Sequence, residues 1–376
     1  MRLFLPSLGL CLYVILSLVL PLPCRPLGKV AAGLVVLAAC LKYQAYEVLG
    51  GSFFAPHLPR PLILTMEALY GAVIVLCFLL LLKDGLALLL WLGRLAGGSW
   101  GLPFSPAARS AGLAALALLL GAWGTWQSVK VPDVRTVEIA VPGLPAQLDG
   151  FSLVQLSDIH IGPLLRGDWL RGVVEKTNAL HPDVVALTGD MVDDLPAAIG
   201  RDMDPLGELR AAHGVFGVTG NHEYYFQWEQ WRPVFARLGV DMLHNEHRVL
   251  SVRGSELVIA GVPDIQESRF GGEGPDPRKA LAGAPDAVRI LLDHRPGGSV
   301  GGSLAHVQLS GHTHGGTMVF LRPLIASFNG GQTSGLYDEN GLKLYVSPGT
   351  GIWDGFSCRV GVPAEITRIV LRPQAS

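Results

Sequence analysis

Apolar residues are distributed in two different ways along the chain. Up to about Gln127 they form long segments, separated by short breaks that contain proline, glycine and charged residues. A helix needs about 20 predominantly apolar residues to cross a bilayer. Segments of roughly this length cover residues 3–22, 30–49, 62–82 and 109–126. We therefore predict an α-helical transmembrane region of about four spans at residues 1–127, with three or five spans as the alternatives.

Parts of this region have more than one interpretation. Residues 85–96 are apolar but short, and they form an interfacial helix, a re-entrant segment or an extension of the preceding helix. Arg2 precedes the first segment as in a signal peptide, but no small-x-small cleavage site follows, so we expect a retained helix. Glu67, inside the third segment, is either a functional carboxylate or a side chain that reaches the lipid headgroups.

After residue 150 the apolar runs become short and alternate with polar segments, which is typical of an α/β domain. Residues 128–149 are predicted to be a linker that contains a first strand, because apolar and polar residues alternate from Val134 to Val141. Periodicity predicts helices at residues 167–180, 204–213 and 227–238, and strands at residues 257–262, 343–346 and 366–371. We expect residues 150–376 to form one domain.

Five apolar, strand-like runs each end in side chains that bind metal ions in other proteins. The segments are Ser157-Asp158-Ile159-His160, Gly189-Asp190, Gly220-Asn221-His222, Asp293-His294 and Ser310-Gly311-His312-Thr313-His314. Ligands of α/β sheets gather at the carboxyl ends of strands. Residues two apart in an extended chain face the same side, so Asp158 and His160 are expected to face one cation. One such pair alone more often caps a turn, but five together favour a metal site.

The types of ligand narrow the choice of metal. Carboxylate, amide and imidazole groups together suit manganese, iron or zinc better than magnesium or calcium, which prefer oxygen ligands alone. None of the five segments contains cysteine, which disfavours a structural zinc site. Two cations about 3.5 to 4 Å apart need a bridging carboxylate. The expected cofactors are two divalent metal ions.

The order Asp-x-His, Gly-Asp, Gly-Asn-His, a lone His and Gly-His-x-His resembles the calcineurin-like metallophosphoesterase superfamily from about Gly150 onward. The sequence Gly-His-Thr-His-Gly-Gly and the apolar segments upstream are similar to its membrane-attached branch. The resemblance implies a four-layer αββα sandwich, preceded here by the transmembrane region.

The resemblance also implies a role for each residue in the five segments. One metal would be bound by Asp158, His160, Asp190 and His314, and the other by Asp190, Asn221, His294 and His312. Asp190 would bridge the two metals. His222 would be the catalytic residue that faces the substrate and protonates the leaving oxygen. The nucleophile would be a metal-bridging hydroxide.

Three residues near the motifs have two interpretations each. Glu223 either orients His222 or is solvated. Asp293 either accepts a hydrogen bond from the imidazole of His294 or faces solvent. Arg359 either contacts a substrate phosphate or is structural.

Together these features predict a membrane-anchored, binuclear phosphoesterase that hydrolyses phosphomonoester, phosphodiester or pyrophosphate bonds. The membrane region favours a lipid-linked substrate. A net charge of −2 and the absence of a Lys/Arg-rich run after residue 150 argue against nucleic acid. The alternative is a membrane sensor or a transporter-like protein, whose metal domain binds metal with little turnover.

The composition also bears on location. With 49% hydrophobic and 16% charged residues the chain is too apolar for an ordinary soluble protein, so we expect a multi-pass protein of the cell membrane. If there are four spans, the basic residues divide evenly between the two sides of the membrane. The side of the catalytic domain has Arg2, Arg60, Lys130 and Arg135, with Lys42 at its edge. The opposite side has Arg25, Lys29, Lys83, Arg94 and Arg109. The positive-inside rule therefore favours neither side for the catalytic domain.

Overall fold

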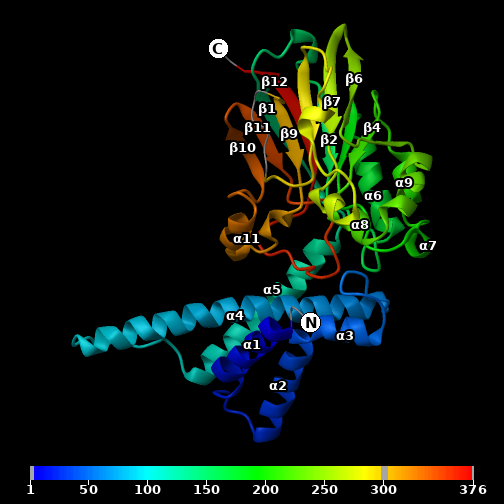
Figure 1. The fold of residues 1–376 in the computed structure, drawn as a ribbon. Coiled ribbons are helices and arrows are strands. Elements are labelled where there is room, and N and C mark those ends of the chain that lie inside the picture. Colours follow the sequence, from blue (N-terminus) through cyan, green and yellow to red (C-terminus); the bar gives the residue numbers. More distant parts are fainter. Residues whose placement is uncertain (1–3, 298–303, 375–376) are drawn as a thin grey trace. The chain divides into compact units, whose positions relative to one another are not determined.

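The computed structural model describes residues 4–297 and 304–374, and the chain divides into two compact units. A helical unit comprises Met1–Gln127 and the short loop Gly355–Val360. An α/β unit comprises Ser128–Asp354 and Gly361–Ser376. The helices and strands of both units are labelled in Figure 1.

The helical unit consists of helices joined by short loops (Figure 1). Its elements are α1 (Phe4–Val14), the π-helical turn η1 (Ile15–Val19), α2 (Pro26–Cys40), α3 (Lys42–Leu49), α4 (Arg60–Leu95) and α5 (Pro106–Val129). Proline stands within the first two positions of α2 and α4, where its fixed φ suits a helix start and its missing N–H costs nothing. Between α2 and α3 the axis bends by 68°, where the sequence changes from apolar residues to Lys42.

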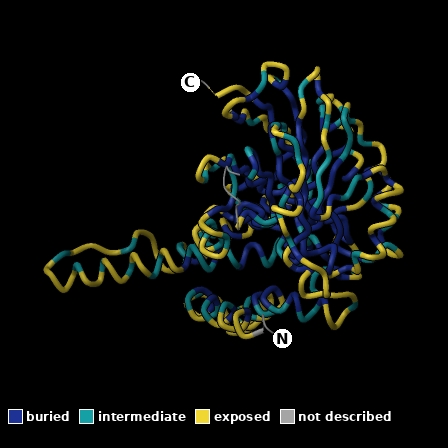
Figure 2. The backbone as a smooth tube through the Cα atoms, turned by 45° about the horizontal axis from the view of Figure 1, so that its top comes forward, coloured by how far each residue is buried: buried dark blue, intermediate teal, exposed yellow. Residues whose placement is uncertain are grey.

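Two helices, α4 and α5, are long and apolar enough to cross a membrane, and the bent pair α2–α3 makes a third if it is one span. The first expected span is shorter, because its apolar helical part covers Leu5–Val19, and Leu3 lies outside the described residues. The structure thus supports two or three spans. Residues 85–95 continue α4, so the extension was the right interpretation. Figure 2 colours much of α4 as exposed, and apolar side chains such as Leu89 and Leu95 are 67% and 70% exposed, as helices that face lipid require.

A buried ion pair lies inside the helical unit. Nζ of Lys42 is 2.6 Å from Oε1 of Glu67, and the two side chains are 0% and 1% exposed. Glu67 also accepts hydrogen bonds from the hydroxyl of Tyr46 and from the backbone N–H of Ser357, each at 2.8 Å. Lys42 donates to the carbonyl of Gly355 at 2.8 Å. Glu67 is therefore held within the protein, and the expectation that it reaches the lipid headgroups was wrong.

The loop Gly355–Val360 packs closely against α4 and α5. A Cβ atom added at Gly71 of α4 would lie 2.5 Å from Sγ of Cys358, and one at Gly124 of α5 would lie 2.6 Å from the same atom. The backbone N–H of Arg359 donates to the carbonyl of Gly124 at 3.0 Å, and Arg359 is 1% exposed. These contacts give Arg359 a structural place in the helical unit.

Two six-stranded mixed sheets form the α/β unit (Figure 1). The first has the order β1 (Asp133–Val141), β12 (Glu365–Pro373), β2 (Ser152–Leu156), β3 (Val184–Thr188), β4 (Val215–Val218) and β5 (Val240–Met242). The second has the order β10 (Gly335–Glu339), β11 (Leu342–Val346), β9 (Val307–Ser310), β8 (Val288–Leu292), β7 (Ser255–Gly261) and β6 (Glu246–Val252). The strands expected from the apolar runs after residue 150 are all present.

Both sheets contribute to one hydrophobic core. Leu153 of β2 and Ala186 of β3 belong to the same buried cluster as Ile259 of β7, Ile290 of β8 and Leu309 of β9, and all are 0% exposed. The two sheets therefore pack face to face as the inner layers of a sandwich. Figure 2 shows in dark blue how much of the backbone of the α/β unit is buried.

Short helices complete the α/β unit. They are α6 (Gly167–Asn178), α7 (Pro196–Ile199), η3 (Asp204–Glu208), α8 (Asn221–Tyr225), α9 (Trp228–Arg237), η4 (Ile265–Phe270), α10 (Pro277–Ala280), η5 (His314–Gly316), η6 (Val319–Leu321) and α11 (Arg322–Phe328), after η2 (Ala146–Leu148). The predicted helices at 167–180 and 227–238 correspond to α6 and α9. The helix expected at 204–213 is only the 3₁₀ segment η3, since Pro205 and Gly207 are poor helix formers.

Strand direction brings the polar segments together. Strands β2, β3 and β4 are parallel neighbours, so the segments that carry Asp158, Asp190 and Asn221 leave the first sheet at one edge. Strands β8 and β9 are also parallel neighbours, and they lead to His294 and His312. Because the two sheets share a core, these edges can supply one site.

Candidate metal centre

Asp158, His160 and His314 form the first group of side chains that can hold a metal ion. One ligand atom from each lies within 4.8 Å of the other two, and all three residues are buried. The Nε2 atoms of His160 and His314 are 3.2 Å apart, and Nε2 of His314 is 3.5 Å from Oδ1 of Asp158. The segments after β2 and β9 thus meet, as the strand order requires.

Asp190, His294 and His312 form the second group, again with ligand atoms within 4.8 Å of one another. Oδ2 of Asp190 lies 3.2 Å from Nε2 of His294. The same oxygen is 3.8 Å from Nε2 of His160, a member of the first group. Asp190 therefore faces both groups. A third group, His160, Asp193 and His222, also has ligand atoms within 4.8 Å of one another.

The backbone of these segments is not the extended chain that we expected. Asp158 and His160 have φ values of 53° and 51°, and Asp190, His312 and His314 have 53°, 68° and 48°. Positive φ is uncommon in residues other than glycine. The argument that Asp158 and His160 share a side through strand alternation was therefore wrong, because β2 ends at Leu156 and left-handed turns aim both side chains at the cluster.

Hydrogen bonds fix which nitrogen of each imidazole faces the cluster. Nδ1 of His294 is 2.8 Å from the carbonyl oxygen of Thr188, and Nδ1 of His160 is 2.7 Å from Oδ1 of Asp193. Each Nδ1 is therefore the donor, and Nε2 is the nitrogen turned toward the cluster. Nε2 of His294 is buried and lies 3.2 Å from Oδ2 of Asp190. Imidazoles held at Nδ1 with Nε2 turned inward are typical of metal ligands, so this donor set fits divalent cations.

Asp193 is a residue of the site that the sequence analysis missed. Its side chain is fully buried, and Oδ1 lies 2.7 Å from Nδ1 of His160 and 2.6 Å from Nδ1 of His222. One carboxylate oxygen thus orients two imidazoles. The available signal was the run Asp193-Asp194 three residues after Asp190, which resembles an ordinary polar loop.

His222 lies at the start of α8, beside the second group. Its Nε2 is 4.0 Å from Oδ2 of Asp190, and its backbone N–H donates to Oδ1 of Asp190 at 2.8 Å. Its ring centroid is 4.6 Å from that of His160 and 6.4 Å from that of Trp353. His222 is 5% exposed, so it lies within the cluster rather than on an open surface.

Glu223 and Asp293 have roles that differ from those expected. Glu223 is fully buried, and its carboxylate accepts from the backbone N–H groups of Asp190, Met191 and Gly220 at 3.0, 2.6 and 2.6 Å. It joins two ligand loops and neither orients the His222 ring nor is solvated. Oδ1 of Asp293 accepts from the N–H of Arg295 at 3.2 Å, whereas the His294 imidazole is held by the Thr188 carbonyl.

Asn221 has a neighbour that the sequence did not indicate. Its Oδ1, the atom that would bind a metal, accepts a hydrogen bond from Nη2 of Arg295 at 3.1 Å. Arg295 in turn contacts Asp264, with Nε 2.6 Å from Oδ2. An amide oxygen has two lone pairs, so this bond orients Asn221 and leaves one lone pair for a cation.

The charges of the cluster shift its pKa values in opposite directions. Burial opposes ionisation of Asp190, but the adjacent His294 and His222 lower its pKa well below the ordinary value. Burial lowers the pKa of His294, but Asp190 outweighs this effect and raises it to about 10. For His222 the carboxylates of Asp190 and Asp193 outweigh burial and raise the pKa to about 9.

Burial shifts the pKa values of two further groups toward their neutral forms. Burial and the charge of Asp190 raise the pKa of Glu223 to about 7. Burial, together with the charge of His294, lowers the pKa of His312 well below its ordinary value. A neutral imidazole is the form that binds metal.

Two glycines let the ligand loops approach each other. A Cβ at Gly311 would overlap Oγ of Ser157 and Oδ2 of Asp158, and one at Gly220 would overlap Oδ1 of Asp190. Oδ1 and Oδ2 of Asp158 also accept from the N–H of His312 at 3.0 and 3.1 Å. These positions require glycine because another segment occupies the space of a side chain.

The chain is similar to proteins of one family. The model of calcineurin-like phosphoesterases matches residues 151–316. The transmembrane protein with metallophosphoesterase domain of Bos taurus is 35% identical over 318 residues, which are 80% of this chain and 71% of that protein. Its namesake in Danio rerio is 35% identical over 266 residues, 68% of this chain and 60% of the relative. An uncharacterized metallophosphoesterase of Helicobacter pylori is 32% identical over 265 residues, 69% of each chain.

Proposed function

Because the chain belongs to the calcineurin-like phosphoesterase family, we propose that it is a membrane-anchored phosphoester hydrolase with a two-metal centre. The position of Asp190 carries this proposal. Its Oδ2 lies 3.2 Å from Nε2 of His294 and 3.8 Å from Nε2 of His160, so one carboxylate faces both groups of ligands. Paired cations in hydrolases need such a bridging group.

The residues that we assign to the cations are taken from the two groups and from the order of the family's motifs, which adds Asn221 and gives Asp190 to both. We assign Asp158, His160, Asp190 and His314 to one cation, and Asp190, Asn221, His294 and His312 to the other. Imidazole with carboxylate suits manganese, iron or zinc. When bound, such cations polarise a phosphoester and lower the pKa of a water molecule.

His222 is the residue that we assign to proton transfer. Its Nδ1 donates to Asp193 at 2.6 Å, which fixes the ring and stabilises its protonated form. A leaving alkoxide needs a proton as the phosphorus–oxygen bond breaks, and an imidazole held in this way can donate it. Asp193 positions the ring and takes no part in the transfer.

We assign the helical unit to membrane anchoring, with α4 and α5 among its spans in a multi-pass protein of the cell membrane. Both helices are long and apolar, and the names of the bovine and zebrafish relatives describe transmembrane proteins. An active domain tethered to a bilayer meets lipid headgroups at high effective concentration. A lipid-linked phosphate or pyrophosphate is therefore the favoured class of substrate.

The test uses the full-length chain in detergent, stripped with chelator and reloaded with Mn²⁺. We would measure turnover of p-nitrophenyl phosphate, bis-p-nitrophenyl phosphate and a short-chain lipid phosphate. Asp190→Asn and His222→Ala should abolish turnover, and only Asp190→Asn should lower the metal content. The control is His181→Asn, because His181 is exposed and has a φ of 47°, which asparagine tolerates.

The outcomes separate the two functional classes. Metal-dependent turnover that both variants lose supports the hydrolase. Two bound metals with no turnover of any ester would instead support the membrane sensor or transporter-like protein.

A further inference from the structure

Arg295, which follows His294 at the end of β8, is held rigidly by a carboxylate. Its Nε lies 2.6 Å from Oδ2 of Asp264, and its Nη2 lies 3.2 Å from Oδ1 of the same residue. Two parallel N–H···O bonds fix the plane of a guanidinium group. The direction of the remaining N–H groups is therefore set by Asp264.

Asp264 is itself fixed and buried. Its side chain is 0% exposed, and its Oδ1 accepts from the N–H of Gln266 at 2.7 Å. Its own N–H donates to Oγ1 of Thr219 at 3.3 Å. A buried carboxylate without a cationic partner would be costly, so the pair with Arg295 stabilises this part of the fold as well as orienting the arginine.

The guanidinium group retains two N–H groups for a ligand. Nε and one N–H of Nη2 serve Asp264, and the other N–H of Nη2 serves Oδ1 of Asn221 at 3.1 Å. The two N–H groups of Nη1 make no hydrogen bond to residues 4–297 or 304–374. The side chain of Arg295 is 31% exposed, so a small molecule can reach it.

Arg295 lies beside the candidate metal centre. Asn221 is one of the residues that we assign to the second metal, so the guanidinium group of Arg295 lies directly beside the candidate centre. Its free N–H groups are therefore within reach of an anion that the centre binds, and arginine is well suited to bind phosphate oxygens.

We propose that Arg295 binds a terminal phosphate oxygen, so that the site prefers phosphomonoesters to phosphodiesters. This inference rests on the proposed hydrolase function. A diester phosphate has two non-bridging oxygens, which a two-cation centre can fully engage. A monoester phosphate has three, and the third is available to Nη1 of Arg295.

The test compares both chromogenic esters in full-length, Mn²⁺-loaded protein. Arg295→Gln should lower kcat/KM for the monoester by about 10- to 100-fold, the range for one hydrogen bond to a charged group, and for the diester by less than about threefold. Arg295→Lys keeps the charge but loses the fork, and should fall between wild type and Arg295→Gln for the monoester.

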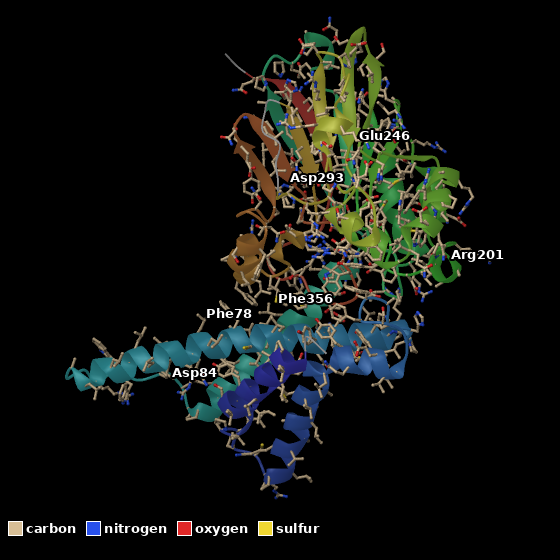
Figure 3. All side chains as sticks on the ribbon, viewed as in Figure 1. Phe78, Asp84, Arg201, Glu246, Asp293 and Phe356 are labelled. Carbon is tan, nitrogen blue, oxygen red and sulfur yellow. The ribbon has the colours of Figure 1, made fainter. Side chains whose placement is uncertain are left out.

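Arg248→Gln is the matched control. Nε and Nη2 of Arg248 lie 2.8 and 2.9 Å from the two carboxylate oxygens of Asp241, which is the same fork as at Arg295. Arg248 also donates to Oε2 of Glu246 at 3.0 Å. Figure 3 labels Glu246, which accepts from Arg248, apart from Asp293, which accepts from the backbone N–H of Arg295. The two arginines therefore belong to different parts of the domain. Loss of this surface fork should change neither ester.

Two further measurements keep the inference falsifiable. Because Arg295→Gln leaves Asp264 unpaired, the double variant Asp264→Asn with Arg295→Gln removes both charges, and it should show the same loss of monoester selectivity. Calorimetry of inorganic phosphate binding to the Mn²⁺-loaded protein should give a Kd about 10-fold weaker for Arg295→Gln.

These measurements separate failure of the inference from failure of the proposed function. A wild-type protein without turnover would refute the proposed hydrolase function. The affinity for inorganic phosphate of wild type and Arg295→Gln would still test whether Arg295 binds phosphate. Active wild type with unchanged ester preference in Arg295→Gln and in the double variant would overturn the inference, as would equal loss of both esters or unchanged phosphate affinity.

Discussion

Replacing Asp193 with asparagine would test how the imidazoles of the metal centre are oriented. Oδ1 of Asp193 lies 2.7 Å from Nδ1 of His160 and 2.6 Å from Nδ1 of His222. Asparagine has the same shape, and its amide oxygen can still accept from the two Nδ1–H groups, but it carries no charge, so both hydrogen bonds become weaker. Both rings should therefore be held less firmly in the orientation that turns Nε2 toward the cluster.

The expected size of the effect follows from these two bonds. A hydrogen bond to a charged group contributes about 1.5 to 3 kcal/mol, and loss of an orienting partner typically weakens metal binding about 10- to 100-fold. Asp193→Asn should therefore raise the Kd for Mn²⁺ by about 10- to 100-fold through His160. At saturating Mn²⁺ a fall in kcat should remain if His222 is the proton donor that we propose, because its ring is held less firmly.

The assay combines Mn²⁺ calorimetry with kcat measured at saturating metal. Asp194→Asn is the control. The carboxylate of Asp194, which is adjacent in sequence to Asp193, accepts from the N–H of Leu195 at 2.7 Å. Thermal unfolding should show that Asp193→Asn is folded. Wild-type metal affinity and wild-type kcat in a folded Asp193→Asn protein would refute the idea that this carboxylate orients the two rings.

Lys42→Met removes the cationic partner of the buried Glu67 carboxylate and should destabilise the helical unit by about 3 to 5 kcal/mol. The double variant Lys42→Met with Glu67→Gln should recover most of this loss. Equal stability of the single and the double variant, measured by unfolding in detergent, would contradict this. Binding of Mn²⁺ near neutral pH should release protons, because the metal displaces the proton that His294 holds up to a pKa of about 10. The affinity for Mn²⁺ should therefore rise with pH and level off above about pH 10. Calorimetry in two buffers of different ionisation enthalpy counts the protons released on binding. Binding that releases no protons would contradict this prediction. Gly311→Ala should abolish tight metal binding through its overlap with Asp158, whereas Gly112→Ala, with nothing within 4 Å of the added Cβ, should not; equal Mn²⁺ affinities would be the opposite result.

The positions of the ligand segments could be predicted from the sequence because they depend on a general property of α/β folds. Apolar runs that become β2, β3, β4, β8 and β9 are recognisable, and polar residues after them lie at strand ends. The division of ligands into two groups came from the family resemblance rather than from spacing. That division stays a prediction, and the side chains around Asp158 and Asp190 are among the groups that could hold a metal ion.

The residues that the sequence analysis missed act through contacts between distant segments. Asp193 meets His222 across 29 positions, and Arg295 meets Asn221 across 74. Nothing local distinguishes such an Asp or Arg from a solvated loop residue. Glu223 was misinterpreted for the same reason, because its partners are backbone N–H groups of another loop.

Two or three helices have the length and composition of a span, where four were expected, because the helical part of the first segment is short, Leu5–Val19, and a bend interrupts the second. The segment at 30–49 contains 20 residues, but a bend of 68° divides it between α2 and α3. The bend leaves Lys42 facing Glu67, which lies on α4. A partner on another helix is invisible in the apolar pattern of either segment.

The left-handed backbone conformation destabilises the fold at five residues of the candidate metal centre. They are Asp158, His160, Asp190, His312 and His314. Each such residue costs about 1 to 2 kcal/mol relative to glycine, and five of them approach the whole net stability of an ordinary domain, about 5 to 15 kcal/mol. Substitutions to glycine at these positions would relax the chain while destroying its chemistry. Selection for thermal robustness alone would therefore favour glycine at these five positions.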